Sequence, residues 1–376
     1  MELKNLQKHI RYLATMEPAE APVLSCYINL EAGLPSYRQA LDEQISALRL
    51  GQNGAARKFF EEALSPVESF IASELKRETK GAALFARGGK APFFLPLQFR
   101  APLPNWMALY PTPNIFHLVE LKDNYHRFVV LFATEEYARI LEVNLGEVTE
   151  EIWRERPELR DRVSTGWSKE HYQHHRKAQT EQFLQEKIKI LDRLMAAGGH
   201  THLLLAGEPR MLARVKQALP KHLLSKLTDT IAASPREKIS DIVASTISSF
   251  IVREEMESLA MVDQLQRELN TGGLAVAGTG ETLNALAWGQ ADVLIVAKNY
   301  EPHAAWRCAD CGMQSDRIAQ PQRCPQCEGT NVHAQNLKEE MLRLAEKHGV
   351  KVEIVMQSDL LQQLGGVGCL LRFRMK

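Results

Sequence analysis

Residues 274–297 read LAVAGTGETLNALAWGQADVLIVA. Leu274 to Ala277 and Val293 to Ala297 are short apolar runs typical of buried strands, and the segment from Glu281 to Trp288 has the spacing of a helix. Strand alternating with helix predicts an α/β core. The pair Gly278-x-Gly280 lacks the third glycine and the acidic ribose-binding residue of a dinucleotide fingerprint, so we reject a nucleotide site there.

Two Cys-x2-Cys pairs interrupt this alternation. They are Cys308 with Cys311 and Cys324 with Cys327, and 12 residues separate them. Four thiolates at this spacing are a typical tetrahedral ligand set for Zn²⁺. Because four protein ligands leave no open position for water, we predict a structural zinc ion and not a catalytic one.

The residues around the cysteines fit this interpretation. Pro325 lies within the second pair, and Gly312 and Gly329 follow the two pairs, as tight turns require. His303 and His333 flank the pairs and are expected to be exposed, since four cysteines suffice. The alternative is a pair of redox-active dithiols, which two coupled pairs in a cytosolic chain disfavour.

The other two cysteines lie in apolar strands. We expect Cys26 and Cys369 to pack as small hydrophobic residues without chemistry of their own.

The rest of the last third continues the α/β pattern. A charged helix from about Arg253 to Leu269 precedes it. After the cysteines, the pattern predicts a helix from Leu337 to Lys347, a strand from Val350 to Val355, a helix from Asp359 to Leu364 and a terminal strand after Gly366.

The middle of the chain also alternates between predicted strands and helices. Strands are expected from Tyr125 to near Gly146, followed by a polar segment to Ser168. A long amphipathic helix then ends at Gly198-Gly199, and Leu203 to Gly207 is expected to be a buried strand.

The N-terminal part has the pattern of a small α+β domain. A first helix precedes a strand from Pro22 to Leu30, and two amphipathic helices meet at Gly51 to Gly54. Extended runs are then predicted at 82–86, 93–99 and 116–121.

A chain of 376 residues is too long for one ordinary core, and we expect three domains. They are an N-terminal α+β domain at 1–122, a middle α/β domain at 123–254 and a C-terminal α/β domain at 255–376, with the zinc insertion at 303–333. The fold class is thus multidomain α/β and α+β.

Charge and hydropathy exclude several classes of protein. Lysine plus arginine equals aspartate plus glutamate, at 46 each, so no global basic field holds a long nucleic acid, and we expect no DNA partner. The longest apolar runs are far shorter than the roughly 20 residues of a membrane span. The first residues have no signal-peptide pattern, and the paired cysteines favour a cytoplasmic protein.

Several stretches together resemble the archaeal and eukaryotic class-I release factors and Pelota, in a bacterial, Balon-like branch. They are GTGETLNALAWGQADVLIV at 278–296, HGVKVEIV at 348–355, LGGVGCLLRFR at 364–374 and LLLAG at 203–207. The resemblance implies a third domain that is an α/β sandwich of the ribosomal kink-turn-binding-protein type with a zinc-ribbon insertion. It also implies a protein that enters the ribosomal A site in place of tRNA.

The chain departs from this family at the catalytic loop. Where the family has Gly-Gly-Gln-Ser, this chain has Thr165, Gly166, Trp167 and Ser168. Without the glutamine that positions water, peptidyl-tRNA hydrolysis is not expected. Trp167 either stacks on an unpaired base or anchors the loop to its own domain.

A cluster of basic and titratable residues follows this loop. His171, His174, His175 and Arg176 fall close together at helical spacing, after a helix start that Ser168 could cap. They could contact RNA phosphates, act as the acid and base of a nuclease, or form a solvated face. Gln173 lies about a turn and a half beyond the tryptophan and is no replacement for the missing glutamine.

The N-terminal part also departs from the family. The Asn-Ile-Lys-Ser tetrapeptide that reads stop codons is absent from the helix junction at 49–58. Arg49, Arg57 and Lys58 could still contact the backbone of ribosomal RNA, although a solvated junction fits equally well.

Three functions remain open at this point. The first is a factor that binds ribosomal RNA at the decoding and peptidyl transferase centres without hydrolysis, for hibernation or handling of stalled ribosomes, with a translational GTPase such as elongation factor Tu as a partner. The second is a rescue hydrolase that releases nascent chains or cleaves tRNA. The third is a zinc-containing adaptor that binds a protein. All three predict a cytoplasmic protein, and the first a ribosome-associated one.

Overall fold

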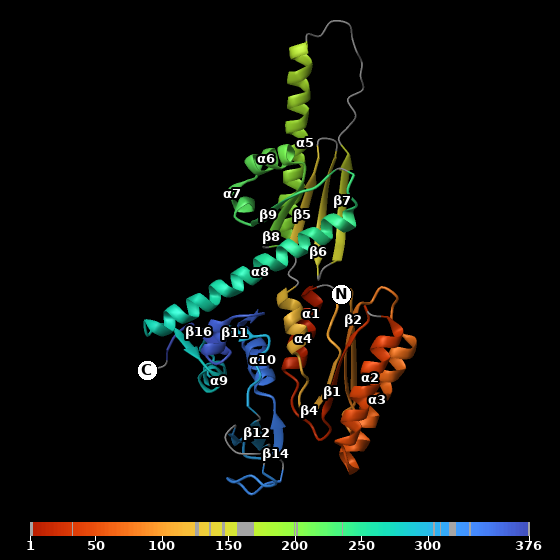
Figure 1. Ribbon diagram of the computed structural model, residues 1–376, viewed down its shortest axis with the longest axis vertical. Coiled ribbons are helices and arrows are strands. Elements are labelled where there is room, and N and C mark those ends of the chain that lie inside the picture. The colour runs from red at the N-terminus through yellow and green to blue at the C-terminus, as the bar shows by residue number, and fades with distance from the viewer. Residues whose placement is uncertain are drawn as a thin grey trace. The chain divides into compact units, whose positions relative to one another are not determined.

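The computed structural model describes the chain except for residues 1–2, 32, 125–127, 135–136, 145–146, 156–168, 199, 201, 235, 304, 309, 316–320, 331 and 375–376. It divides into two compact units (Figure 1). The first unit joins Met1–Asn124 to Glu255–Lys376, and the second is Tyr125–Glu254. Each half of the first unit has its own sheet. The three-domain division stays a prediction.

The N-terminal half of the first unit is a four-stranded antiparallel sheet in the order β3-β2-β1-β4. Its central strand β1 is fully buried at Cys26, which confirms the prediction that this thiol packs in the core. The elements are α1 (Leu3–Ala14), β1 (Val23–Asn29), α2 (Leu34–Leu50), α3 (Gly54–Ser73), β2 (Gly81–Arg87), β3 (Phe93–Phe99), β4 (Trp106–Tyr110) and α4 (Phe116–Asn124).

One face of this sheet carries α2 and α3. The apolar side chains of the two helices recur at helical spacing and meet the alternate residues of β1 and β2 that point toward them. Phe60 and Leu64 of α3 are buried with Leu84 of β2 in the same cluster. This packing explains why the predicted helices and strands in this part are found.

Two predictions in this half are wrong. The run at 116–121 is helix α4 and not a strand, and the strand β4 was not predicted. A mixed run of only six residues fits the periodicity of a helix and that of a strand, so the run alone does not decide between the two. The tertiary structure decides here, because the first backbone N–H groups of α4 bond to a side chain more than 200 residues away.

The C-terminal half has a mixed sheet in the order β10-β16-β11-β15. Strand β15 is parallel to β11, and β16 is antiparallel to both β10 and β11. The predicted alternation is confirmed, and Cys369 is buried in β16. The elements are β10 (Ala275–Ala277), α9 (Thr279–Ala287), β11 (Ala291–Ala297), α10 (Leu337–His348), β15 (Lys351–Val355), α11 (Asp359–Gln363) and β16 (Val367–Leu371).

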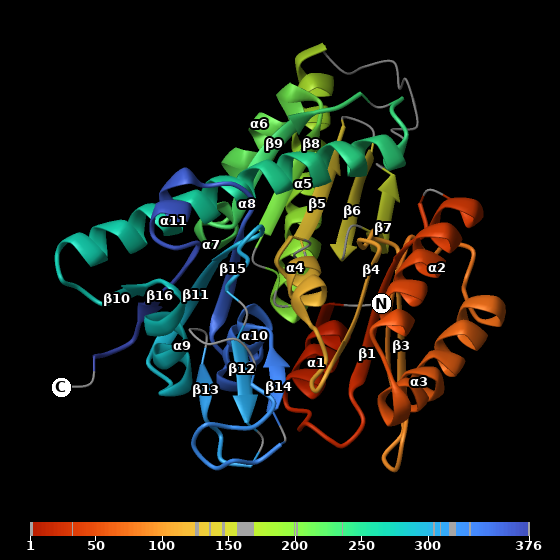
Figure 2. The same ribbon diagram turned by 60° about the horizontal axis from the view of Figure 1, so that its bottom comes forward.

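The insertion between β11 and α10 forms a sheet of its own. Its three short strands have the order β13-β12-β14 and are labelled in the lower part of Figure 2. They are β12 (Ala305–Cys308), β13 (Gln314–Ser315) and β14 (Val332–Gln335). Both cysteine pairs belong to this insertion.

The second unit is a three-layer α/β structure. Its sheet has the order β7-β6-β5-β8-β9, with β8 parallel to both β5 and β9. The elements are β5 (Phe128–Ala133), β6 (Tyr137–Asn144), β7 (Glu147–Glu155), α5 (Lys169–Gly198), β8 (His202–Gly207), α6 (Pro209–Ala218), α7 (Lys221–Leu224), β9 (Leu227–Ala232) and α8 (Ile239–Asn270), of which only the first part belongs here.

The central strand β5 shows why this sheet is covered on both faces. Val129 and Leu131 pack against α5 and α6, whereas Phe128 and Val130 pack against the start of α8. Figure 1 shows these helices on opposite sides of the sheet. A strand buried on both faces reads as a continuous apolar run, as 128–133 does.

Three elements in this part differ from the predictions. Helix α8 begins at Ile239, well before the predicted Arg253, because Ile242, Val243 and Phe250 form a second apolar face under the sheet. The predicted polar segment contains the strand β7, and strand β9 was not predicted. Both β7 and β9 are edge strands, whose weak patterns are easily missed.

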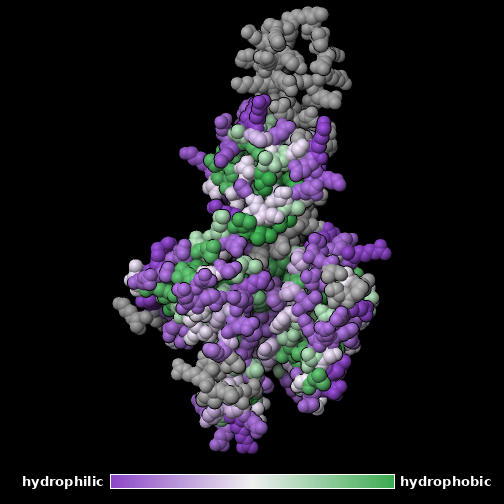
Figure 3. Space-filling model, viewed as in Figure 1, coloured by the Kyte–Doolittle hydropathy of each residue, from purple (hydrophilic) through white to green (hydrophobic). Residues whose placement is uncertain are grey.

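Within the described part of the chain, no helix is both long and apolar enough to cross a bilayer. The face drawn in Figure 3 is mostly hydrophilic, with hydrophobic residues in small separate patches.

Candidate functional site

The four cysteine sulfurs of the insertion converge on one point. The Sγ atoms of Cys308 and Cys327 lie 3.6 Å apart, as do those of Cys311 and Cys324, and all four sulfurs lie within 4.8 Å of one another. With Zn–S bonds of about 2.3 Å, a tetrahedral site needs sulfurs about 3.8 Å apart. The donor set and its spacing therefore fit a single Zn²⁺ ion.

Backbone hydrogen bonds close each cysteine pair into a tight turn. Gly312 donates to the carbonyl of Cys308 at 3.0 Å, and Glu328 donates to the carbonyl of Cys324 at 2.9 Å. In addition, the N–H of Gln326 donates to the sulfur of Cys324 at 3.4 Å, a contact that stabilises a thiolate. The turns thus present the sulfurs, and the second turn favours the charged form of Cys324.

The two predicted turn glycines have different physical roles. Gly312 has φ 78°, which only glycine adopts without strain. At the second turn the left-handed residue is Glu328, with φ 57°. Gly329 leaves room for its neighbours: a Cβ there would lie 2.1 Å from a carboxylate oxygen of Asp310 and 3.2 Å from the sulfur of Cys327, so the Asp310 side chain would have to move.

A small apolar core supports the cysteines. Trp306 is 1% exposed and packs with Cys308, Cys324 and Val332. The other two cysteines are exposed, so each pair has one buried and one exposed sulfur. The flanking His303 and His333 are exposed, as predicted. A core this small cannot hold a fold by itself, so a metal would act as the main cross-link.

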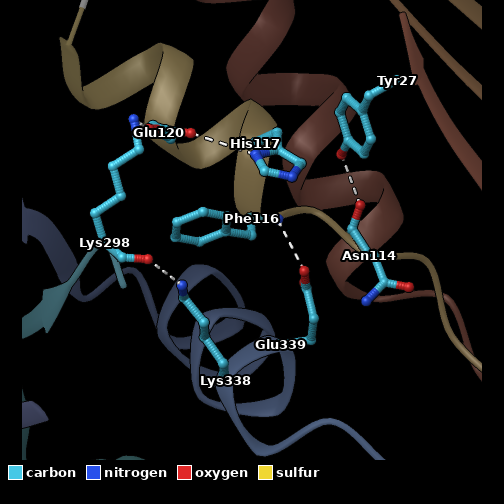
Figure 4. Close-up of polar contacts among 8 residues, drawn as sticks. All are labelled: Tyr27, Asn114, Phe116, His117, Glu120, Lys298, Lys338 and Glu339. Atoms are coloured by element: carbon cyan, nitrogen blue, oxygen red, sulfur yellow. Dashed lines mark hydrogen bonds and ion pairs between the residues drawn. The ribbon is translucent and has the colours of Figure 1, made fainter. Parts of the chain in front are cut away.

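A second group of charged residues joins the two halves of the first unit (Figure 4). The carboxylate of Glu339 in α10 accepts hydrogen bonds from the N–H groups of Ile115 at 2.7 Å and Phe116 at 3.2 Å. These are orphan donors at the N-terminus of α4. Glu339 therefore caps a helix of the other half, and its negative charge lies at the positive end of that helix.

Lys338, next to this carboxylate, packs on the same helix. Its ammonium lies 3.6 Å from the centroid of the Phe116 ring and donates to the carbonyl of Lys298 at 2.7 Å. Burial lowers the pKa of Lys338 to about 8. Burial also raises the pKa of Glu339 to about 7, against the opposing effect of its two backbone donors.

Further ion pairs extend the contact along α4. Lys298 pairs with Glu120 at 2.6 Å, and Lys122 pairs with Glu346. Burial raises the pKa of Glu120, but hydrogen bonds from His117 and Lys298 outweigh this effect and hold the pKa below its ordinary value. The carboxylate of Asp123 accepts from the N–H of Ile354 at 2.7 Å and so covers the edge of β15.

One local sequence pattern lies at this contact, and by itself it would indicate a different hydrogen-bond partner for Glu339. Asn336 and Glu339 have the spacing of a capping box, and the Asn336 side chain does accept from the N–H of Glu339 at 3.2 Å. In a capping box the glutamate would bond to the backbone of its own helix. Here it bonds to α4 instead.

Two family models match the chain from residue 113 onward. The family described as "Bacterial archaeo-eukaryotic release factor family 10" matches residues 113–249, and "eRF1 domain 3" matches residues 255–375. The chain belongs to the release factor/Pelota superfamily, in its bacterial type. This confirms the resemblance read from the sequence.

Curated relatives include peptide chain release factor subunit 1 of Pyrococcus abyssi, 28% identical over 157 residues, and that of Thermococcus onnurineus, 26% identical over 159 residues. The matches cover 37% of this chain and 36% and 37% of those two relatives, so they span little more than a third of the relatives' length.

Solved structures similar to this superfamily member include two that extend over almost the whole chain. The crystal structure of Archaeoglobus fulgidus Pelota covers 100% of this chain and 93% of its own, with 14% identity and a TM-score of 0.36. An archaeal translation termination factor covers 99% of both chains, with 16% identity and a TM-score of 0.28.

The residues that distinguish this chain from other release factors fall mostly outside the described part. Thr165, Gly166, Trp167 and Ser168 lie outside the described residues. His171, His174, His175 and Arg176 belong to the first two turns of α5, whose backbone is described and whose side chains there are not. The helix start at Lys169 agrees with the predicted one.

Of the three predicted RNA-contact residues of the N-terminal half, Arg49 and Lys58 are paired with carboxylates, and Arg57 is exposed. Arg49 donates to both oxygens of Glu61, at 2.7 and 2.9 Å, and Lys58 lies 3.8 Å from Glu62. These are partly exposed pairs on α2 and α3. The geometry agrees with the alternative that this junction is a solvated surface of the release-factor-like chain.

Proposed function

We propose that this protein occupies the ribosomal A site as a release factor/Pelota-type factor without hydrolysing peptidyl-tRNA, in hibernation or in the handling of stalled ribosomes. The observation that carries the proposal is Thr165-Gly166-Trp167-Ser168 directly before α5, where the family has Gly-Gly-Gln-Ser. Membership of the superfamily supports the binding, and the altered loop supports the loss of chemistry.

The chemical argument concerns what the loop can do at the peptidyl transferase centre. Ester hydrolysis there needs a polar group that orients a water molecule toward the carbonyl carbon. The indole of Trp167 has one N–H donor and no acceptor, and it is far larger than an amide. It is suited to stacking on an unpaired base, which Gly166 would allow by giving the loop its flexibility.

The basic start of α5 would add contacts to ribosomal RNA. His171, His174 and His175 have i, i+3 and i+4 spacing, so they share one helix face, with Arg176 beside them. Contacts of this kind recognise phosphates and depend on salt. This group therefore contributes affinity and no base specificity.

The remaining parts of the proposal concern the C-terminal half. It is an α/β sandwich of the kink-turn-binding-protein type, its insertion is a zinc ribbon with a structural Zn²⁺, and its partner is a translational GTPase such as elongation factor Tu. In the bound state the protein is cytoplasmic and ribosome-associated. The convergence of the four thiols supports the zinc, and the superfamily supports the type of partner.

The decisive experiment is co-sedimentation of the full chain with bacterial ribosomes on sucrose gradients, with and without starvation. Ribosome association without release of peptide from stalled complexes is expected.

Trp167→Ala should weaken ribosome binding about tenfold, which is the typical effect of losing one stacked base. Trp288→Ala is a matched control, since Trp288 is also a tryptophan and is 61% exposed in the other unit. Sedimentation entirely among free proteins would overturn the proposal.

A second candidate is a rescue enzyme that cleaves tRNA or releases peptide with the histidines. The shared helix face of His171, His174 and His175 favours it, because two imidazoles can act as acid and base. The same stalled complexes separate the two candidates. Cleavage that His174→Ala or His175→Ala abolishes would support the enzyme, and unchanged peptidyl-tRNA would exclude it.

A further inference from the structure

A cavity of 520 Å³ opens within the first unit, on the side of the zinc insertion. Four segments line it: residues 17–18 after α1, residues 110–114 at the end of β4, the insertion around Arg307 and Gln335, and α10. Its volume lies within the range of small-molecule sites, roughly 300 to 1,000 Å³. Cys308, one of the four thiols of the insertion, is among the lining residues, whereas the proposed A-site contacts do not use this cavity.

The inner wall of the cavity contains two acceptors without donors. Asn114 is 1% exposed, and none of the described residues donates a hydrogen bond to its Oδ1 atom. The same is true of the buried Oε1 atom of Gln335. Buried acceptors are normally satisfied, so two in one cavity indicate a ligand or solvent that donates hydrogen bonds.

The rest of the Asn114 side chain and backbone is held in place. The backbone N–H of Asn114 donates to Ser25 at 3.0 Å, and its carbonyl accepts from Tyr27 at 2.6 Å. Its side chain also hydrogen bonds to Glu339, and Figure 4 shows the amide nitrogen on the Glu339 side. The free oxygen is therefore a fixed feature of the wall.

The outer rim of the cavity carries two basic side chains and one acidic side chain that are exposed. Arg307 and Lys347 have no ion pair within the described chain, and Glu17 is the exposed carboxylate. The lining carboxylates are mostly engaged, since Glu340 pairs with Arg343 at 2.8 Å and Glu339 caps α4. Free cations at the rim favour an anionic group on the ligand.

The cavity therefore suits a ligand that donates hydrogen bonds at one end and carries an anion at the other. A nucleotide has both, in the N–H groups of its base and in its phosphate. The half-buried Tyr110 lies in the same lining and offers an aromatic face for a base. We infer that this cavity binds a ribonucleotide, whose base donates to Asn114 and Gln335 and whose phosphate lies at Arg307 and Lys347. A free nucleoside monophosphate and an unpaired nucleotide of an RNA share this chemistry.

The site also has a structural consequence. Its walls come from the N-terminal half, from the insertion and from α10, so a bound nucleotide would connect all three. A ligand that binds only the folded unit stabilises it by mass action. Binding can therefore be followed by calorimetry and by the midpoint of thermal unfolding, on the isolated protein and without ribosomes.

The experiment titrates the full-length, zinc-containing chain with the four ribonucleoside monophosphates, the four nucleosides and four single-stranded tetranucleotides. The monophosphate should bind at least tenfold more tightly than its nucleoside, because only it reaches the rim cations. Arg307→Ala should remove most of this difference. Arg323→Ala is the matched control, since Arg323 is exposed in the same insertion and does not line the cavity.

The inner wall is tested separately with Gln335→Leu, which removes the acceptor and keeps the side-chain size. It should weaken the nucleoside and the monophosphate equally, whereas Arg307→Ala should leave the nucleoside unchanged. Equal binding of monophosphate and tetranucleotide would identify a free nucleotide as the ligand, and a clear preference for the tetranucleotide would identify RNA. No binding at millimolar concentration, or the same loss in Arg307→Ala and Arg323→Ala, would overturn the inference.

Discussion

The zinc insertion and the contact between α4 and α10 hold the first unit together in opposite ways. The insertion depends on residues 308–327, which are close in sequence, and its small core is supplemented by four thiols. The contact joins residues more than 200 positions apart and is built on buried charges. The comparison shows that the convergence of four thiols can be predicted from their spacing, whereas a buried charged interface becomes visible only in the folded structure.

The largest expected effect is on the zinc insertion. Cys324→Ser removes one of four ligands, and the bound zinc should fall from about one equivalent to a small fraction, because structural zinc contributes most of the stability of such a module. Metal analysis and hydrogen exchange over 305–335 would measure this. Cys26→Ala is the control and should keep its zinc. Full zinc content in Cys324→Ser would contradict the four-thiol site.

The second-largest effect is expected at the contact between α4 and α10. Glu339→Ala leaves the N–H groups of Ile115 and Phe116 buried without an acceptor, which should lower the free energy of unfolding by about 2–5 kcal/mol. Urea denaturation would measure it. Glu281→Ala, at an exposed glutamate in the first turn of α9, should change it by less than about 1 kcal/mol. Equal effects of the two variants would show that Glu339 is no cap.

The same contact should make stability depend on pH. The pKa of Glu339 is raised from 4.5 to about 7, so between these values the folded protein keeps a proton that the unfolded chain loses, and stability falls as pH rises. The pKa of Lys338 is lowered from 10.5 to about 8, so between these values the unfolded chain holds the extra proton, and stability rises with pH. A minimum between about pH 7 and pH 8 follows, with a depth on the order of 2 kcal/mol.

The measurement is a pH series of urea denaturation curves for the wild type and for the double variant Glu339→Gln/Lys338→Met. The difference between the two proteins isolates these two titrations from all others. A difference that is flat from pH 5 to pH 10 would mean that neither group is perturbed by burial. The zinc insertion should contribute nothing to this difference.

The smallest effect is expected at the pair between Arg49 and Glu61. It is bidentate, but both side chains are partly exposed, so Arg49→Ala should lower the free energy of unfolding by less than about 1 kcal/mol. The pair should also weaken with added salt. A loss as large as that of Glu339→Ala would show that exposed and buried ion pairs contribute alike in this protein.

Most helices and strands followed from the sequence, because their apolar residues repeat at the period of the element that buries them. The run at 274–297 predicted β10, α9 and β11, and the two cysteine pairs predicted one metal site. The errors fell at edge strands β4, β7 and β9, at the start of α8 and at α4. In these places the pattern is short or weak, and the neighbouring elements decide the conformation.

By itself, the sequence determined the superfamily, the alternation of helices and strands, and the cysteine spacing, since each is a local pattern within a few dozen residues. Only the tertiary structure decided that Glu339 caps α4, that Gly329 lies against the Asp310 side chain, and that Asn114 and Gln335 share one cavity. The physical reason is that burial, desolvation and hydrogen bonding between distant segments depend on which surfaces meet, and no local spacing records that.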